Sequence, residues 1–199
     1  KKFSVPNYGL KLFVMNFQHT WHLNHSVCEI VPLKYEDNRG FFSETYKKNI
    51  FEEIGITEKF VQENLSFSRN KYTFRGLHFQ RPPFEQAKLV RVLKGSILDI
   101  AVDLRSSSPT YLQHVSLELS ALNFKQLFIP AGFAHGFLTL EENCEIAYKI
   151  SNYYNEPSDT TVSVFDKDIE IRLPCEKNQI TFSSKDADAQ SWKSIGEIF

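Results

Sequence analysis

The stretch KLVRVLKGSILDIAVDLR, residues 88–105, has the pattern of two β-strands that meet at Gly95. In its first half, Lys88, Val90 and Val92 alternate with Leu89 and Arg91, which is the period-two pattern of a strand with two different faces. No helical segment separates the two strands. This arrangement favours a sandwich or barrel over a parallel α/β sheet.

The same pattern continues on both sides of this stretch. Short strand-like runs bounded by Gly, Pro, Asn, Asp and Ser are expected at residues 28–35, 59–68, 74–80, 114–120, 126–130, 135–140 and 144–151. One short helix is expected at residues 49–55, and the tail after Pro174 has no clear pattern. The sequence therefore predicts an all-β, jelly-roll β-barrel with a few short helices and an interior large enough for a ligand.

The length of 199 residues and the 42% apolar content predict one domain, which we place at residues 15–199. Residues 1–14 precede the only methionine, Met15, and are interpreted as an N-terminal extension. The 23 basic and 24 acidic residues leave no overall charge of the kind that nucleic-acid or membrane-surface binders carry. We therefore expect neither partner, and any anion recognition must be local.

Three cysteines, Cys28, Cys144 and Cys175, lie far apart and form no C-x-x-C motif. Their number and spacing argue against a disulfide framework and against a thiolate zinc site. The chain contains no apolar run of about 18 residues. These observations favour a soluble protein of the reducing cytoplasm.

Two segments resemble the paired motifs of the cupin jelly roll. Residues 129–137, IPAGFAHGF, resemble the second motif, and GLHFQ at residues 76–80 resembles a first motif that lacks one ligand. Metal-binding cupins carry H-x-H in the first motif, whereas here Gln80 replaces the second histidine. Only His78, Glu85 and His135 remain as ligands, so we expect neither a metal nor a cofactor.

A lone histidine on a strand is more often a hydrogen-bonded structural residue than a catalyst. The alternation of residues 74–80 would place Phe74, Gly76, His78 and Gln80 on one face, where the glycine leaves room beside the imidazole. Tyr148 alternates with Ile146 and could project into the same cavity. The sequence thus offers one candidate base and one candidate acid.

Seven segments in the same order resemble the dTDP-4-dehydrorhamnose 3,5-epimerase family across residues 28–192. They are EDNRGFFSETY (36–46), FVQENLSFS (60–68), RGLHFQ (75–80), AKLVRVLKGSILDIAVDLRSSSPTY (87–111), QLFIPAGFAHGF (126–137), YKISNYY (148–154) and FSSKDADA (182–189). The resemblance implies inversion of two carbons of dTDP-4-dehydro-6-deoxy-D-glucose without a metal. It also implies a homodimer of jelly rolls, with strands exchanged and a neighbour's residues completing each substrate site.

A proton next to the C4 ketone is acidic because the resulting charge delocalises onto oxygen, so the reaction needs a base, a cation near that oxygen and an acid on the other face. His78 suits the base, and the resemblance implies that Asp186 is the carboxylate that orients it. Lys88 is the candidate at the enolate, and Tyr148 is the candidate acid. The resemblance further assigns substrate binding to Arg39, Glu44, Gln62, Glu63, Asn64, Arg75, Lys88, His135, Asp159 and Lys185.

Asp159 stands where the family commonly has glutamate, which is one methylene longer. Three alternative functions remain open at this point. The chain could be an epimerase that inverts only C3 or only C5 of a related sugar, a nucleotide-sugar-binding cupin without activity, or a metal-dependent cupin oxygenase.

Overall fold

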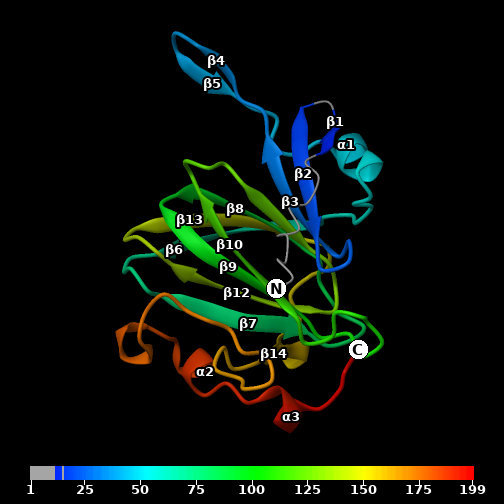
Figure 1. Ribbon diagram of the computed structural model, residues 1–199, viewed down its shortest axis with the longest axis vertical. Coiled ribbons are helices and arrows are strands. Elements are labelled where there is room, and N and C mark those ends of the chain that lie inside the picture. Colours follow the sequence, from blue (N-terminus) through cyan, green and yellow to red (C-terminus); the bar gives the residue numbers. More distant parts are fainter. Residues whose placement is uncertain (1–11, 15) are drawn as a thin grey trace, which may run out of the picture.

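Two β-sheets packed face to face form the body of the protein (Figure 1). The computed structural model describes residues 12–14 and 16–199. In this part of the chain, the larger sheet has the strand order β1-β2-β3-β11-β8-β13-β6 and the smaller sheet the order β10-β9-β12-β7-β14. The neighbouring strands of both sheets are antiparallel, and the predicted all-β jelly roll is confirmed.

The strands of the larger sheet are β1 (Leu12–Val14), β2 (Phe17–His22), β3 (Val27–Pro32), β11 (Gln126–Ile129), β8 (Lys88–Lys94), β13 (Cys144–Ile150) and β6 (Gln62–Ser68). Those of the smaller sheet are β10 (His114–Ser120), β9 (Ser96–Asp103), β12 (Phe133–Thr139), β7 (Phe74–Gln80) and β14 (Asp159–Thr161). The short helices are α1 (Lys48–Glu53), α2 (Ser184–Ala187), α3 (Trp192–Ile195) and the 3-10 turns η1 (Glu156–Ser158) and η2 (Lys177–Gln179).

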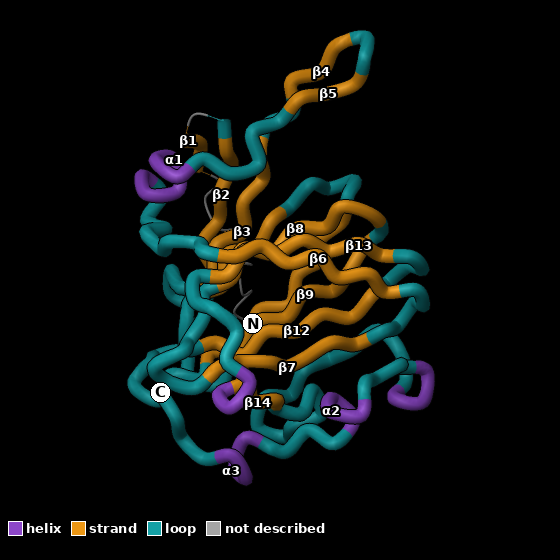
Figure 2. Tube along the Cα trace, turned by 180° about the vertical axis from the view of Figure 1, so that it is seen from behind, coloured by secondary structure: helices purple, strands orange, loops and turns teal. Residues whose placement is uncertain are grey.

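Apolar side chains fill three separate layers. Between the sheets, Val90 and Val92 of β8 pack with Ile97 and Ala101 of β9. The outer face of the smaller sheet is covered by the chain after β14, which carries α2 and α3 (Figure 2). The outer face of the larger sheet packs against α1. Because the C-terminal segment is fixed on the smaller sheet, its polar residues can reach the end of β7.

Strand β7 is irregular where it passes β12. Gly76 has a φ of +135°, and a Cβ atom on it would lie only 2.5 Å from the Cα of Gly136, so glycines allow the close approach of the two strands. The register shifts between His135 and Phe137 of β12, where β7 contains one additional residue. As a result Arg75 and His78 both line the same cavity. The expectation of strict alternation along residues 74–80 is therefore wrong at this bulge.

A hairpin of β4 (Tyr35–Asp37) and β5 (Gly40–Phe42) projects away from the body (Figures 1 and 2). It exposes the aromatic side chains of Tyr35, Phe41 and Phe42. We call residues 35–42 the arm. The sequence does not predict this hairpin, because its short strands are interrupted by a charged turn that contains Arg39.

The proposed N-terminal extension lies largely outside the described residues, since residues 1–11 and 15 are not described. Leu12–Val14 forms β1, which pairs with β2. Among the described residues, no helix combines the length and apolar character needed to cross a bilayer.

Candidate active site

One elongated cavity opens between the two sheets. It consists of two adjoining hollows of about 370 and 450 Å³, and His78, Lys88 and Tyr148 line both. The first hollow also contains Arg75, His135, Lys185 and Asp186, and the second contains Gln62, Asn64, Gln80, Tyr154 and Asp159. The structure thus brings most of the candidate residues to one place, although they come from distant parts of the sequence.

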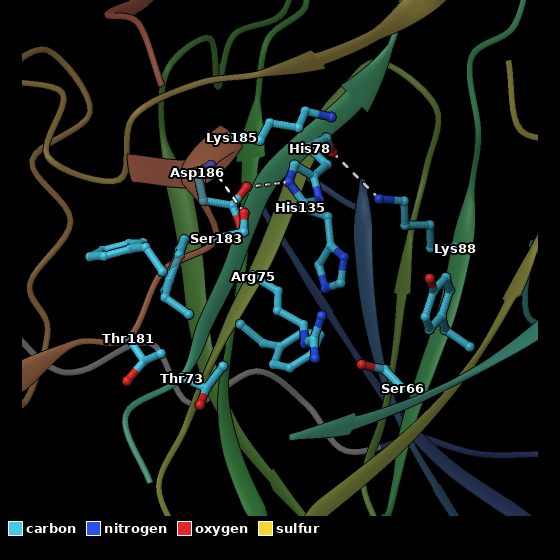
Figure 3. Close-up of a pocket in the computed structure, with 14 residues that line it drawn as sticks. Ser66, Thr73, Arg75, His78, Lys88, His135, Thr181, Ser183, Lys185 and Asp186 are labelled. Atoms are coloured by element: carbon cyan, nitrogen blue, oxygen red, sulfur yellow. Dashed lines mark hydrogen bonds and ion pairs between the residues drawn. The ribbon is translucent and has the colours of Figure 1, made fainter. Parts of the chain in front are cut away.

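His78 and Asp186 form a hydrogen-bonded pair at the first hollow (Figure 3). The imidazole Nε2 lies 2.6 Å from Asp186 Oδ1, and the aspartate side chain is only 4% exposed. Helix α2 positions it, because the Ser183 hydroxyl caps the helix by accepting from the Asp186 backbone N–H. Burial acts to raise the pKa of Asp186, but the hydrogen bond and charge of His78 hold that pKa below its usual value. The carboxylate therefore stays ionised and can stabilise an imidazolium.

Lys88 approaches His78 from the opposite sheet (Figure 3). Its Nζ lies 3.4 Å from the carbonyl oxygen of His78. Removal from water lowers the pKa of Lys88 to about 8, although the charges of Asp159 and Asp99 act to raise it. Lys88 is therefore a cation near neutral pH, poorly hydrated and available to a developing negative charge.

Tyr148 lies on β13 of the larger sheet, whereas His78 lies on β7 of the smaller sheet. Both side chains line the cavity between the sheets. Burial raises the pKa of the Tyr148 phenol, while a hydrogen bond with Asn64 lowers it in part. The phenol therefore keeps its proton at neutral pH and faces the imidazole from the opposite wall.

A second imidazole–carboxylate pair was missed by the sequence reasoning. His135 Nε2 lies 3.0 Å from both carboxylate oxygens of Asp99, which is fully buried. Burial lowers the pKa of His135, and the charge of Asp99 acts in the opposite direction. The sequence predicts both strands but not their pairing: β9 lies directly beside β12 and pairs Asp99 with Phe137, two residues from His135.

The polar residues of β6 are divided between its two faces. Gln62 and Asn64 line the second hollow, and Gln62 Nε2 donates to Asn64 Oδ1 at 2.8 Å. Glu63 points to the outer face, where its carboxylate lies 3.3 Å from Lys149 and 3.9 Å from Arg91. Strand alternation thus places Glu63 on the outer face of the larger sheet, away from the cavity of its own chain.

Charged side chains line both hollows of the cavity. Arg75 donates from Nε to the Ser68 hydroxyl at 3.1 Å and from Nη2 to the Phe67 carbonyl at 3.0 Å. Lys185 forms an ion pair with Asp159, which also accepts a hydrogen bond from the Tyr154 hydroxyl at 3.1 Å. The guanidinium and ammonium groups are thus held by the fold and can meet an anionic ligand.

Arg39 and Glu44 do not reach the cavity of their own chain. Arg39 lies in the exposed arm and pairs with Asp37, while Glu44 accepts a hydrogen bond from Asn16 at 2.8 Å. Their assigned role in substrate binding therefore depends on a second chain.

The cavity does not fit a cupin-type metal ion. Gln80 stands where metal-binding cupins have a second histidine, and its amide is engaged by backbone groups. Within the described residues, no three or more His, Cys, Asp or Glu side chains are grouped in a way that could hold a metal ion. The donors that remain at this cavity are suited to proton transfer rather than to coordination.

The pKa of Lys88 predicts an alkaline limit to activity. Below about pH 8 the ammonium carries its charge, and above this value a growing fraction is neutral. We expect kcat/KM, which reports the groups of the free enzyme, to fall as the pH rises through about 8. The variant Lys88→Arg keeps its charge in this range and should lose the alkaline limit, even if its activity is lower. A wild-type profile that stays flat well above pH 8 would contradict this role.

The protein is a jelly roll whose central cavity has an imidazole–carboxylate pair and a phenol on opposite walls. This arrangement is that of an enzyme that uses acid–base catalysis on a substrate bound between the two sheets. The family model for dTDP-4-dehydrorhamnose 3,5-epimerase matches residues 24–194. The chain belongs to this family, which consists of isomerases.

Individual relatives agree with this membership. The dTDP-4-dehydrorhamnose 3,5-epimerase of Salmonella typhimurium is 48% identical over 164 residues, which cover 82% of this chain and 88% of the relative. That of Sinorhizobium fredii is 43% identical and covers 92% of both chains. A crystal structure of dTDP-6-deoxy-D-glucose-3,5-epimerase from Legionella pneumophila in complex with dTDP-4-keto-L-rhamnose is 40% identical, with a TM-score of 0.85 over 90% of this chain and 95% of the other. Both sequence and fold are therefore similar over most of the chain.

Proposed function

We propose that the protein is an epimerase that converts dTDP-4-dehydro-6-deoxy-D-glucose to dTDP-4-dehydro-L-rhamnose by inverting C3 and C5. The observation that carries this proposal is the placement of His78 on one sheet, paired with Asp186 of α2, and of Tyr148 on the other sheet, across one cavity. Inversion requires removal of a proton from one face of the sugar and its return to the other face. Opposing walls provide a base and an acid in that arrangement.

Each inversion begins with loss of a proton next to the C4 ketone. His78 accepts this proton, and the ionised Asp186 stabilises the resulting imidazolium. Charge develops on the C4 oxygen, where the Lys88 ammonium stabilises it in a site with little water. Tyr148 then donates its proton to the same carbon from the opposite face. Before the next inversion, the imidazolium of His78 gives up its proton to solvent and the tyrosinate of Tyr148 takes one back. No cofactor takes part, because proton transfer alone completes the isomerisation.

The remaining polar residues suit the other parts of the substrate. A diphosphate requires cations and donors, and Arg75, Lys185, Gln62 and Asn64 provide them along the cavity. His135, held by Asp99, can donate to a sugar oxygen. Asp159 is shorter than the glutamate common at this position, but its pairing with Lys185 keeps it at the cavity wall.

We further propose a cytoplasmic homodimer in which the arm of each chain completes the cavity of its partner. The exposed aromatic residues of the arm and the exposure of Arg39, whose guanidinium pairs with Asp37 of the same arm, support this assembly. Arg39 and Glu44 would then bind the substrate held by the other chain. The three free cysteines, Cys28, Cys144 and Cys175, are consistent with a reducing compartment.

Mixed dimers test the shared site. Arg39→Ala should raise KM, and His78→Ala should abolish most turnover. If arms are exchanged, a dimer of the two variants has one intact site, so exchange of subunits should restore roughly a quarter of the wild-type sites. If each site belongs to a single chain, mixing restores nothing. Activity is measured at a substrate concentration below the KM of Arg39→Ala, before and after subunit exchange.

The reaction itself is tested by proton NMR of dTDP-4-dehydro-6-deoxy-D-glucose in D₂O, with a coupled 4-ketoreductase and NADPH to trap the product. Deuterium at C3 and C5 with an L-rhamnose-configured product supports the 3,5-epimerase. Label at one carbon would instead indicate a mono-epimerase, and dTDP binding without label would indicate a binding protein. Turnover should be unchanged after treatment with a metal chelator, and its loss would contradict the metal-independent mechanism.

A further inference from the structure

Gln80, at the end of β7, occupies the position where metal-binding cupins carry the second histidine of H-x-H. Its side chain is buried, with 4% exposure, and all of its hydrogen-bonding groups are used. The amide nitrogen donates to the carbonyl of Phe84 at 2.5 Å and to that of Tyr153 at 3.1 Å. The amide oxygen accepts from the backbone N–H of Asn155 at 2.7 Å. One side chain thus binds three backbone groups in two separate segments.

These two segments, residues 81–87 and 151–155, are also tied directly to each other. Gln86 Nε2 donates to the Asn152 carbonyl at 2.8 Å, and the Ser151 hydroxyl accepts from the Ala87 backbone N–H at 2.8 Å. Gln80 lies between the segments and joins both to the end of β7. A change at Gln80 therefore acts on both segments together.

The second of these segments leads into a wall of the substrate cavity. Tyr154 lies within it, and its hydroxyl donates to Asp159, which pairs with Lys185. Asp159 itself is the register partner of Gln80 across β14 and β7. Gln80, Tyr154 and Asp159 line the second hollow, which they share with His78, whereas Asp186 lines only the first hollow. The hydrogen bonds of the Gln80 side chain lead to the segment that carries Tyr154, and none of them joins it to the side chains of His78, Asp186 or Tyr148.

We propose that Gln80 is a positioning residue that fixes the wall formed by Tyr154 and Asp159 and so sets the affinity for the nucleotide sugar rather than the rate of proton transfer. This inference rests on the proposed function. A neutral histidine has one donor and one acceptor and cannot satisfy two carbonyls and an N–H at once. Glutamine provides two donors and one acceptor. Where metal-binding cupins have a ligand, this side chain therefore holds the cavity wall through three hydrogen bonds, a role that we call the clamp.

The substitution Gln80→Met keeps the length of the side chain and removes all three hydrogen bonds. We expect KM and the Kd for dTDP to rise about tenfold while kcat changes less than about threefold, since the lost interactions support binding and not the transition state alone. The matched control is Gln113→Met at an exposed glutamine outside both hollows, which should behave as wild type. An equal fall of kcat and kcat/KM in Gln80→Met, with dTDP affinity unchanged, would overturn the assignment.

The substitution Gln80→Glu provides a second readout that a purely structural role would not show. The introduced carboxyl can still accept from Asn155, but when ionised it faces the carbonyls of Phe84 and Tyr153. Protonation restores one donor, and burial should raise the pKa of this carboxyl by a few units. KM of Gln80→Glu should therefore fall toward the wild-type value as the pH is lowered, relative to Gln80→Met at the same pH. Identical pH dependence of KM in the two variants would contradict the clamp.

Hydrogen–deuterium exchange separates a failure of this inference from a failure of the proposed function. Gln80→Met should exchange faster than wild type at Asn155 and its neighbours, with residues of β13 as the internal reference. A wild-type protein that does not turn over the substrate would contradict the proposed function, and the exchange result would still decide whether Gln80 clamps the two segments. Unchanged exchange at Asn155 would remove the clamp whatever the activity. Thermal unfolding of both Gln80 variants checks that they are folded.

Discussion

Replacing His78 by alanine is expected to lower kcat by about 10²- to 10⁴-fold, the range typical of a lost general base. The proton next to the C4 ketone would then have no acceptor at the cavity wall, and the ionised Asp186 would have no imidazolium to stabilise. The Kd for dTDP should change little, because His78 is assigned to the sugar and not to the nucleotide. The measurements are coupled turnover with the 4-ketoreductase and dTDP binding by calorimetry.

The control for this result is the partner of His78. Asp186→Asn keeps the shape of the side chain but removes its charge, so it should lower kcat through the imidazole and leave dTDP affinity intact. Since the two residues act as one unit, the double variant should be scarcely slower than His78→Ala alone. Wild-type deuterium incorporation by His78→Ala would remove His78 from the mechanism. Independent, multiplying losses in the double variant would separate Asp186 from it.

The sheet architecture could be predicted because most strands of the body have one buried face. The nine predicted runs and the helix at residues 49–55 correspond to β3, β6 to β13 and α1, with boundaries that differ by a few residues. Period-two alternation is a local property, so the sequence alone can show it. Strands with little burial pattern could not be found this way, as the exposed residues of the arm illustrate.

The bulge in β7 limited the prediction of the site. Strict alternation predicts that Gly76 and His78 share one face of β7 and that Arg75 lies on the other. The additional residue of β7 opposite β12 instead brings Arg75 to the same cavity as His78. Such a register shift depends on the contact between Gly76 and Gly136, which are 60 residues apart in the sequence. Local periodicity carries no information about contacts at that separation.

The pairing of His78 with Asp186 could be suggested from a sequence motif but explained only from the structure. The two residues are 108 positions apart, and the composition of residues 183–192 indicates only a surface turn. Resemblance to a family suggested the pair, and the packing of the C-terminal segment on the smaller sheet explains how it forms. Asp99 had no such motif in the sequence reasoning, although its strand was predicted correctly. Its role depends on the neighbour relation of β9 and β12.

Replacing Tyr148 by phenylalanine is expected to lower product formation by about 10²-fold, because the cavity loses the acid on the wall opposite His78. The phenyl ring retains the packing of Tyr148 against the core between the sheets, so folding and dTDP binding should be preserved. Tyr153→Phe is the matched control, since that side chain is 64% exposed and its substitution should leave turnover unchanged. Product is followed by the coupled reductase.

The decisive measurement on Tyr148→Phe is the fate of deuterium in recovered substrate. His78 remains able to remove a proton, and after exchange with solvent it can return deuterium to the face from which the proton came. The variant should therefore place deuterium in substrate of unchanged configuration faster than it forms product. Unchanged product formation would exclude Tyr148 as the acid, and loss of both exchange and product would assign it to deprotonation instead. Exchange with retention has a structural reason, because the base lies on β7 of one sheet and the acid on β13 of the other. Inversion requires both residues, whereas exchange on one face of the sugar requires only His78.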